Sequence, residues 1–174
     1  MVNSMAKGEI TTVPGGPTIA DGIAVKTPGD ITFGILHRYI DDIVTVDEDE
    51  IANAILLLLE RAKITSEGAG AASVAAVLNS LPEIKGKKIA AVVSGGNIDV
   101  NMLSRIIDQG LLKSGRKVFL DTIIPDRPGT LCKLLNLVAE TGANVLSVNH
   151  NRISQEVAIG RAKVELELET ADDE

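Results

Sequence analysis

Residues 88–99 read KIAAVVSGGNID and join a continuous apolar run to a hydroxyl and two glycines. The apolar run, 89–93, is typical of a strand that is covered on both faces in a parallel sheet. Ligands of open α/β sheets bind beyond the carboxyl ends of the strands, so we expect Ser94 to lie at a binding site. The two glycines let the backbone turn sharply and let a ligand come close. From the local sequence alone, a plain tight turn explains them equally well.

Helical and strand patterns alternate on both sides of this segment. A short helix over 31–39 and a strand over 42–46 come first, and Asp47 followed by Glu50 matches a capping box. Apolar spacing then predicts a helix over 51–62, a Gly/Ala-rich helix over 66–81 and an amphipathic helix around 100–111. The alternation predicts an α/β domain with a parallel sheet over residues 1–113.

A different pattern follows residues 114–117, which are polar, contain a glycine and are predicted to form a linker. One strand is expected over 118–124, and a helix begins after the turn PDRPGT and stops at Gly142. Two more strands are expected over 144–148 and 162–169, the last with apolar and charged residues in alternation. The order strand, helix, strand, strand predicts a ferredoxin-like split βαβ unit over 118–174 without its last helix and strand.

Composition excludes several classes of protein. The chain has 174 residues with 17 Lys and Arg against 24 Asp and Glu, and its net charge of −7 argues against a nucleic-acid partner. The strongly apolar stretch at 54–59 is too short to span a membrane, and the N-terminus has no signal-peptide pattern. A single cysteine, Cys132, cannot form an internal disulfide. We therefore expect a cytoplasmic protein with neither a membrane nor a nucleic-acid partner.

Three stretches within residues 1–113 resemble, in order and spacing, the catalytic domain of the threonine dehydratase (threonine ammonia-lyase) family. They are GGPTIADGIAVKTPGDITFGILHRYIDDIVTVDEDEI (15–51), ITSEGAGAASVAAVL (64–78) and KIAAVVSGGNID (88–99). The family belongs to the second fold type of pyridoxal-phosphate enzymes. Residues 117–152 resemble the start of the ACT regulatory domain that many of these enzymes carry. The resemblance implies the C-terminal part of a catalytic domain, followed by an incomplete ACT domain.

The resemblance also implies a reaction and a cofactor site. Pyridoxal phosphate is the expected cofactor, and the expected reaction converts threonine to 2-oxobutanoate and ammonia, or serine to pyruvate. Ser94 matches the residue whose hydroxyl binds the pyridine nitrogen, and Gly95 belongs to the glycines that make room for the ring. Glu67 matches a carboxylate near the ring, and Gly22 matches a backbone segment beside it. From the residues alone, Glu67 is equally explained as a carboxylate favoured at a helix N-terminus, and Gly22 as a loop glycine.

No catalytic residue is assigned within this chain. The family's Schiff-base lysine, in a Ser-Phe-Lys-x-Arg-Gly context, and its Gly-rich phosphate-binding loop do not occur in the sequence. Lys26 and Lys63 are therefore interpreted as surface charges. We expect further residues before Met1 and after Glu174. Two other interpretations stay open, namely a non-catalytic amino-acid-binding or dimerisation module, and one half of a split enzyme.

The ACT-like half has a candidate site of its own. Asp126 and Gly129 lie in the turn that enters its helix, and Asn144 lies on the adjoining predicted strand. In related modules such loops bind a regulatory amino acid, here isoleucine or valine, at an interface between two copies, so a homo-oligomer is expected. Ordinary helix-start chemistry, with Asp126 as a cap, is the alternative. His37 and His150 have no metal-ligand spacing to other residues, so we expect both to be structural and no metal site.

Overall fold

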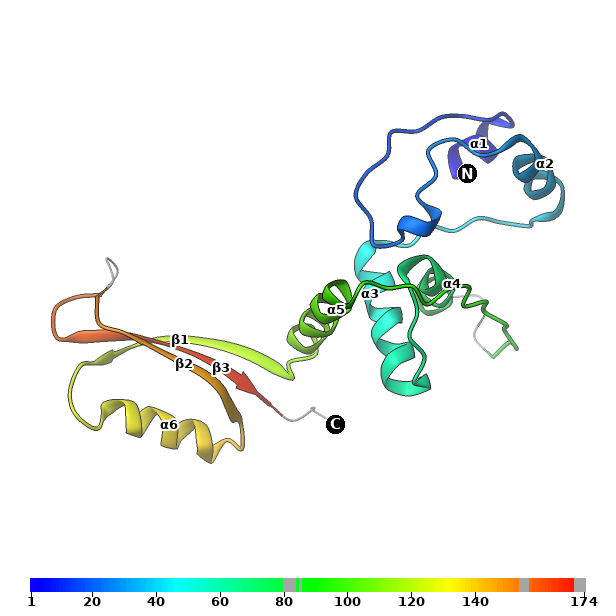
Figure 1. Ribbon diagram of the computed structural model, residues 1–174. Coiled ribbons are helices and arrows are strands. Elements are labelled where there is room, and N and C mark those ends of the chain that lie inside the picture. Colours follow the sequence, from blue (N-terminus) through cyan, green and yellow to red (C-terminus); the bar gives the residue numbers. More distant parts are fainter. Residues whose placement is uncertain (80–83, 85, 154–156, 171–174) are drawn as a thin grey trace. The chain divides into compact units, whose positions relative to one another are not determined.

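The computed structural model describes residues 1–79, 84, 86–153 and 157–170. The chain divides into two compact units, Met1–Ile106 and Ile107–Glu174, and each unit has a hydrophobic core of its own. Figure 1 shows helices and loops in the first unit, and a sheet with one covering helix in the second. None of the helices within the described residues has the length and apolar character needed to cross a bilayer.

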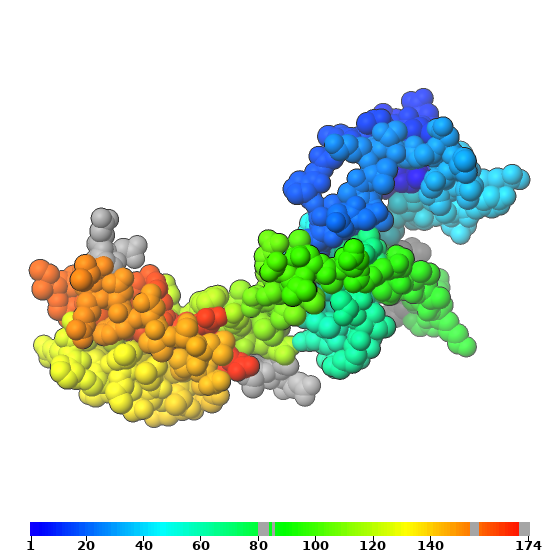
Figure 2. Space-filling model, viewed as in Figure 1, coloured from blue at the N-terminus to red at the C-terminus, as the bar shows by residue number. Residues whose placement is uncertain are grey.

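Helices build the first unit, and the predicted helices are confirmed. Its helices are α1 (Val2–Lys7), η1 (Asp21–Ile23), α2 (Asp30–Tyr39), α3 (Glu48–Leu57), η2 (Leu58–Ala62) and α4 (Gly68–Asn79), and α5 (Val100–Lys113) begins in it. The predicted helix over 66–81 extends to two residues, Ser80 and Leu81, that lie outside the described part. The space-filling view shows an opening between stretches of the N-terminal part of this unit, which is drawn in blue in Figure 2.

Helix α3 packs against α4 to form the core of this unit. The predicted capping box starts α3, because the Asp47 carboxylate accepts from the Glu50 N–H at 2.8 Å and the Glu50 carboxylate accepts from the Asp47 N–H at 2.8 Å. Small residues on α4 allow the two helices to come close. The buried core residues are Ala20, Ile51, Ala54, Ile55, Leu58, Ala71, Ala75 and Ile106.

The prediction of strands at 42–46 and 89–93 is wrong for this chain. Neither segment forms a strand, and the described residues of the first unit contain no sheet. A strand persists only when neighbouring backbone satisfies its N–H and C=O groups, and the described part of the unit offers neither segment such a neighbour. Apolar side chains predicted to be covered are instead open to solvent, with Ile89 46% exposed and Val92 73% exposed.

The second unit has the predicted split βαβ arrangement. Strand β1 (Lys117–Pro125) is followed by helix α6 (Thr130–Glu140), then by β2 (Asn144–Asn151) and β3 (Arg161–Glu169). Strand β3 lies between β1 and β2 and pairs antiparallel with both. Helix α6 packs on one face of this sheet, against buried residues of β3, as Figure 1 shows. The buried core residues of the unit are Ile124, Val138, Ala162, Val164, Leu166 and Leu168.

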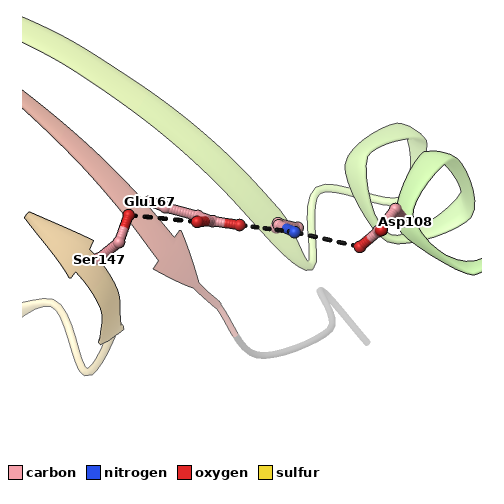
Figure 3. A network of polar contacts seen from close by, with 4 residues as sticks. Asp108, Ser147 and Glu167 are labelled. Carbon is pink, nitrogen blue, oxygen red and sulfur yellow. Dashed lines mark hydrogen bonds and ion pairs between the residues drawn. The ribbon is translucent and has the colours of Figure 1, made fainter. Parts of the chain in front are cut away.

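The other face of the sheet carries charged side chains, as the alternation along β3 predicted. Lys117 Nζ lies 2.6 Å from Glu167 Oε1 and 3.1 Å from Asp108 Oδ1 on α5. The second Glu167 oxygen accepts from the Ser147 hydroxyl on β2 at 3.2 Å. Figure 3 shows this row of contacts, which links α5, β1, β3 and β2. The hydrogen bond from Lys117 lowers the pKa of Glu167, and hydrogen bonds to Glu167 and Asp108 raise the pKa of Lys117.

Replacing Lys117 is expected to make the free energy of unfolding depend less on pH in the acid range. A lowered carboxyl pKa in the folded state means that Glu167 stabilises the fold above its unfolded pKa, and that this stabilisation disappears as the pH falls through its folded pKa. In urea unfolding of the chain from pH 7 down to pH 3, Lys117→Met should therefore lose less stability on acidification than the parent. The effect is small, because ion pairs near the surface are screened.

Lys133→Met provides the matched control, because Lys133 on α6 has no carboxylate partner within the described residues. The control should keep the parental pH dependence. If both variants lost equally less stability than the parent on acidification, the effect could not be assigned to Glu167.

Candidate functional site

The candidate site of the first unit is formed where residues 94–97, the SGGN loop, meet the start of α4. The loop follows the segment 89–93 and leads into α5, whose first turn is capped by Asp99. The Asp99 carboxylate accepts from the backbone N–H groups of Asn101 and Met102 at 2.9 and 3.0 Å. The loop is therefore anchored on its C-terminal side by an ordinary helix start.

Hydrogen bonds hold the SGGN loop against residues 66–67, about thirty positions earlier in the chain. The Glu67 N–H donates to the Gly95 carbonyl at 3.1 Å, and the Ser66 hydroxyl lies 3.3 Å from the same oxygen. In return, the Asn97 N–H donates to Glu67 Oε2 at 3.3 Å. The Glu67 carboxylate is thus held by a backbone donor of the loop.

Glycines make this contact possible. A Cβ atom added to Gly95 would lie 2.5 Å from the carboxylate carbon of Glu67, and one added to Gly70 would lie 2.8 Å from the Gly95 oxygen. Both distances are shorter than any ordinary carbon contact. A side chain at Gly70 would press on the backbone of the SGGN loop, and one at Gly95 would displace the Glu67 carboxylate. The requirement for glycine here comes from close approach and not from an unusual φ angle.

Three of the four residues predicted to bind the cofactor come together around one carboxylate. Gly22 lies beside Glu67, since a Cβ on Gly22 would be 3.3 Å from Glu67 Oε1, and Gly95 lies against the other side. The fourth residue, Ser94, is exposed, and its hydroxyl has no hydrogen-bond partner within the described residues. Ser94 directly precedes Gly95, the loop residue that lies against the half-buried Glu67 carboxylate. Lys26 and Lys63 are exposed, as expected of surface charges.

No pattern in the sequence had pointed to Ser66 or Gly70. Ser66 precedes an acidic residue at a helix start, where serine is common, and Gly70 is one of several small residues in the Gly/Ala-rich helix. Their importance depends on the contact with Gly95, which is remote in sequence. A long-range contact of this kind leaves no local signal.

In the second unit, Asp126 and Gly129 line a concavity of about 580 Å³ at the start of α6. Gly129 precedes α6 with a φ of 85°, and Asp126 Oδ1 forms an ion pair with Arg152 Nε at 3.1 Å. His150 also lines this concavity, and its Nε2 atom is buried without a hydrogen-bond partner in the described part of the unit. A buried nitrogen without a partner is costly, and the sequence had not pointed to His150 as a residue of this concavity.

Asn144 lies at the other end of the sheet. It pairs in register with Glu169 at the end of β3, and its amide donates to the Glu169 carboxylate at 3.4 Å. The Asp126 N–H donates instead to the Gly160 carbonyl, just before the start of β3. Within one chain the structure brings Asp126 and Gly129 together and leaves Asn144 apart from them.

The chain matches a known protein family and named relatives. Residues 1–95 match the family model described as "Pyridoxal-phosphate dependent enzyme". An L-threonine ammonia-lyase of Thermotoga maritima is 62% identical over 99% of this chain and 43% of its own length, and one of Geobacter sulfurreducens is 46% identical over 96% of this chain and 42% of its own.

Part of the chain also superposes on solved structures. The processed form of threonine deaminase isoform 2 from Solanum lycopersicum superposes with a TM-score of 0.57 at 31% identity, covering 63% of this chain and 31% of the tomato chain. The chain thus spans less than half the length of these relatives. Because the family model covers more than half of the chain and includes Gly22, Glu67, Ser94 and Gly95, this chain belongs to the family of pyridoxal-phosphate-dependent enzymes.

Proposed function

We propose that this chain is part of an enzyme that converts threonine to 2-oxobutanoate and ammonia with pyridoxal phosphate, and that serine is its second substrate. The observation that carries the proposal is the contact of Gly22 and Gly95 with Glu67, together with a Ser94 hydroxyl that directly precedes Gly95 and has no hydrogen-bond partner within the described residues. The names of the bacterial relatives, at 62% and 46% identity, support threonine as the substrate.

The residues of the site fit the cofactor. An aromatic ring needs close approach to backbone, and the absence of side chains at Gly22 and Gly95 brings the backbone of both segments up to the Glu67 carboxylate. A ring nitrogen needs a polar partner, and the Ser94 hydroxyl is free to provide one. Glu67 is half-buried, with one oxygen bonded to the Asn97 N–H, so its carboxylate has a fixed position.

Each residue then has a definite task. Pyridoxal phosphate, when bound, withdraws electrons from the carbon that loses its proton. Ser94 binds the ring nitrogen through a neutral hydroxyl, which does not hold that nitrogen protonated as a carboxylate would. A weakly withdrawing ring suits an elimination, in which a hydroxyl leaves the substrate promptly. The glycines hold the loop close to α4.

The lysine and the phosphate-binding loop that the family uses are proposed to lie outside the 174 residues of this sequence. The lysine would remove the α-proton of the substrate, and this chain would supply the side of the pocket that binds the ring. We further propose a homo-oligomer and a cytoplasmic location, the latter supported by the single cysteine.

The second unit is proposed to be an ACT-type regulatory module that binds isoleucine or valine. Support comes from its split βαβ topology and from the concavity that contains Asp126 and Gly129. Backbone N–H groups in the first turn of α6 suit the carboxylate of an amino acid. Because Asn144 lies at the opposite end of the sheet, its participation requires the site to be shared between two copies.

The proposed reaction is tested with the intact enzyme that carries this chain, together with its Ser94→Ala and Ser94→Cys variants. Threonine deamination by Ser94→Ala should fall about 10- to 100-fold, since losing one hydrogen bond to a buried polar atom costs about 1–3 kcal/mol. Ser94→Cys, with a similar size and a polar hydrogen, should retain more activity than Ser94→Ala. A parent enzyme that binds no pyridoxal phosphate and forms no 2-oxobutanoate would refute the proposal.

A further inference from the structure

Ser66 is a polar residue buried completely in the first unit. Its exposed fraction is 0%, and the other buried polar side chain among the described residues of this unit is Ser4. Burying a hydroxyl is unfavourable unless hydrogen bonds compensate for the lost water. The position therefore needs an explanation in terms of what the hydroxyl contacts.

The contacts of Ser66 differ from those of a helix cap. A capping serine accepts a hydrogen bond from a backbone N–H in the first turn of its helix. The Ser66 hydroxyl instead faces two carbonyl oxygens, that of Glu67 at 3.0 Å and that of Gly95 at 3.3 Å. A hydroxyl that faces two acceptors serves as the donor, and Ser66 shares its single proton between the nearer Glu67 carbonyl and the Gly95 carbonyl of the SGGN loop.

The Gly95 carbonyl therefore has two donors directed at it. It receives the Glu67 N–H at 3.1 Å in addition to the contact with Ser66. Gly70 leaves the space that this arrangement needs, because a Cβ there would lie 2.8 Å from both the Ser66 oxygen and the Gly95 oxygen. Ser94, one residue before Gly95, is exposed and has no contact of its own that fixes its direction within the described residues.

We propose that Ser66 is a positioning residue for the cofactor: it fixes the Gly95 peptide and thereby sets the direction of the Ser94 hydroxyl relative to the Glu67 carboxylate. This role rests on the proposed function, because the direction of Ser94 matters only when a ring nitrogen is bound. Ser66 itself touches neither the ring nor the substrate. Its effect passes through the backbone of residues 94 and 95.

The test uses the intact enzyme with Ser66→Ala, and Ser73→Ala as the matched control. Ser73, on the same helix, donates its hydroxyl to the Val92 carbonyl at 2.7 Å, two residues before Ser94. Both variants thus remove a serine hydroxyl that contacts the backbone of residues 92–95. Pyridoxal phosphate affinity and the absorbance and fluorescence maxima of the bound cofactor are measured, and they report the surroundings of the ring directly.

Ser66→Ala should bind pyridoxal phosphate about tenfold more weakly, the size expected for one lost hydrogen bond, and should shift the fluorescence maximum of the bound cofactor. Ser73→Ala should keep both properties of the parent. Ser66→Cys, which preserves the size of the side chain but donates weakly, should give an intermediate shift, and it serves as the test should Ser66→Ala not fold.

Two results would overturn the inference. One is parental affinity and spectra in Ser66→Ala, or in Ser66→Cys where only that variant folds. The other is an equal change in cofactor affinity and fluorescence maximum in Ser73→Ala. Loss of any hydrogen bond to the backbone of residues 92–95 would then disturb the cofactor, and Ser66 would have no special role. Failure of the proposed function is recognised separately, since the parent enzyme itself would then bind no cofactor.

Discussion

Gly95→Ala is expected to weaken pyridoxal phosphate binding about 10- to 100-fold, because the Glu67 carboxylate must turn away from the added Cβ and lose its hydrogen bond from Asn97, and a hydrogen bond to a charged group contributes about 1.5–3 kcal/mol. The added Cβ would meet the carboxylate of Glu67 at 2.5 Å, and Glu67 is held in place by the Asn97 N–H. Either the SGGN loop or the carboxylate must move, and both belong to the proposed cofactor site. Affinity is measured by titrating the intact apoenzyme with the cofactor and following visible absorbance.

Gly34→Ala is the matched control for this substitution. Gly34 lies within α2, where an added Cβ meets no atom within 4 Å, and alanine is the better helix former. The control should bind the cofactor as the parent does and should be equally or more stable to unfolding. Unchanged affinity in Gly95→Ala would mean that the close contact between Gly95 and Glu67 does not shape the site.

Gly129→Val is expected to reduce binding of isoleucine or valine about tenfold. Gly129 has a φ of 85°, and a β-branched residue in this left-handed region costs about 1–2 kcal/mol, so the turn entering α6 should relax to another shape. The relaxed turn would redirect the backbone N–H groups beside the concavity. Binding is measured by calorimetry on the intact enzyme with each amino acid in turn.

Gly142→Val separates binding from stability in this test. Gly142 follows the C-terminal end of the same helix with a φ of 79°, and, like Gly129, it has no atom within 4 Å of an added Cβ. Valine there imposes a similar backbone strain at a distance from Asp126 and Gly129. It should lower thermal stability to a similar extent and leave amino-acid affinity unchanged. Equal losses of affinity in Gly129→Val and Gly142→Val would mean that both substitutions act by destabilising the unit, and not by changing the concavity.

Features that depend on neighbouring residues were predictable from the sequence. The capping box at Asp47 and Glu50 needs only four residues, and the structure contains it. The alternation along β3 reports a strand with one buried face, and Val164 and Leu166 are indeed buried. The split βαβ topology also followed, because short connections limit how these elements can pair.

Features that depend on distant residues were not predictable in the same way. The apolar run at 89–93 has the composition of a buried strand, yet within the described residues no neighbour pairs with it. The gathering of Gly22, Glu67 and Gly95 was expected only through resemblance to a family. Ser66 was not predictable because its partner in the loop, the Gly95 carbonyl, is 29 residues away. His150 was not predictable because only the folded structure determines whether a histidine nitrogen has a hydrogen-bond partner.

The contact between the SGGN loop and the start of α4 also gives the site its own local opening equilibrium. The N–H groups of Glu67 and Asn97 each donate across this contact, so each is shielded from solvent while the contact persists. Amide hydrogen exchange at these two positions would therefore follow the separation of loop and helix, which need not require the whole unit to unfold. Exchange faster at these amides than in the core of α3 would mean that the ring-binding side of the pocket opens while the rest of the unit stays folded.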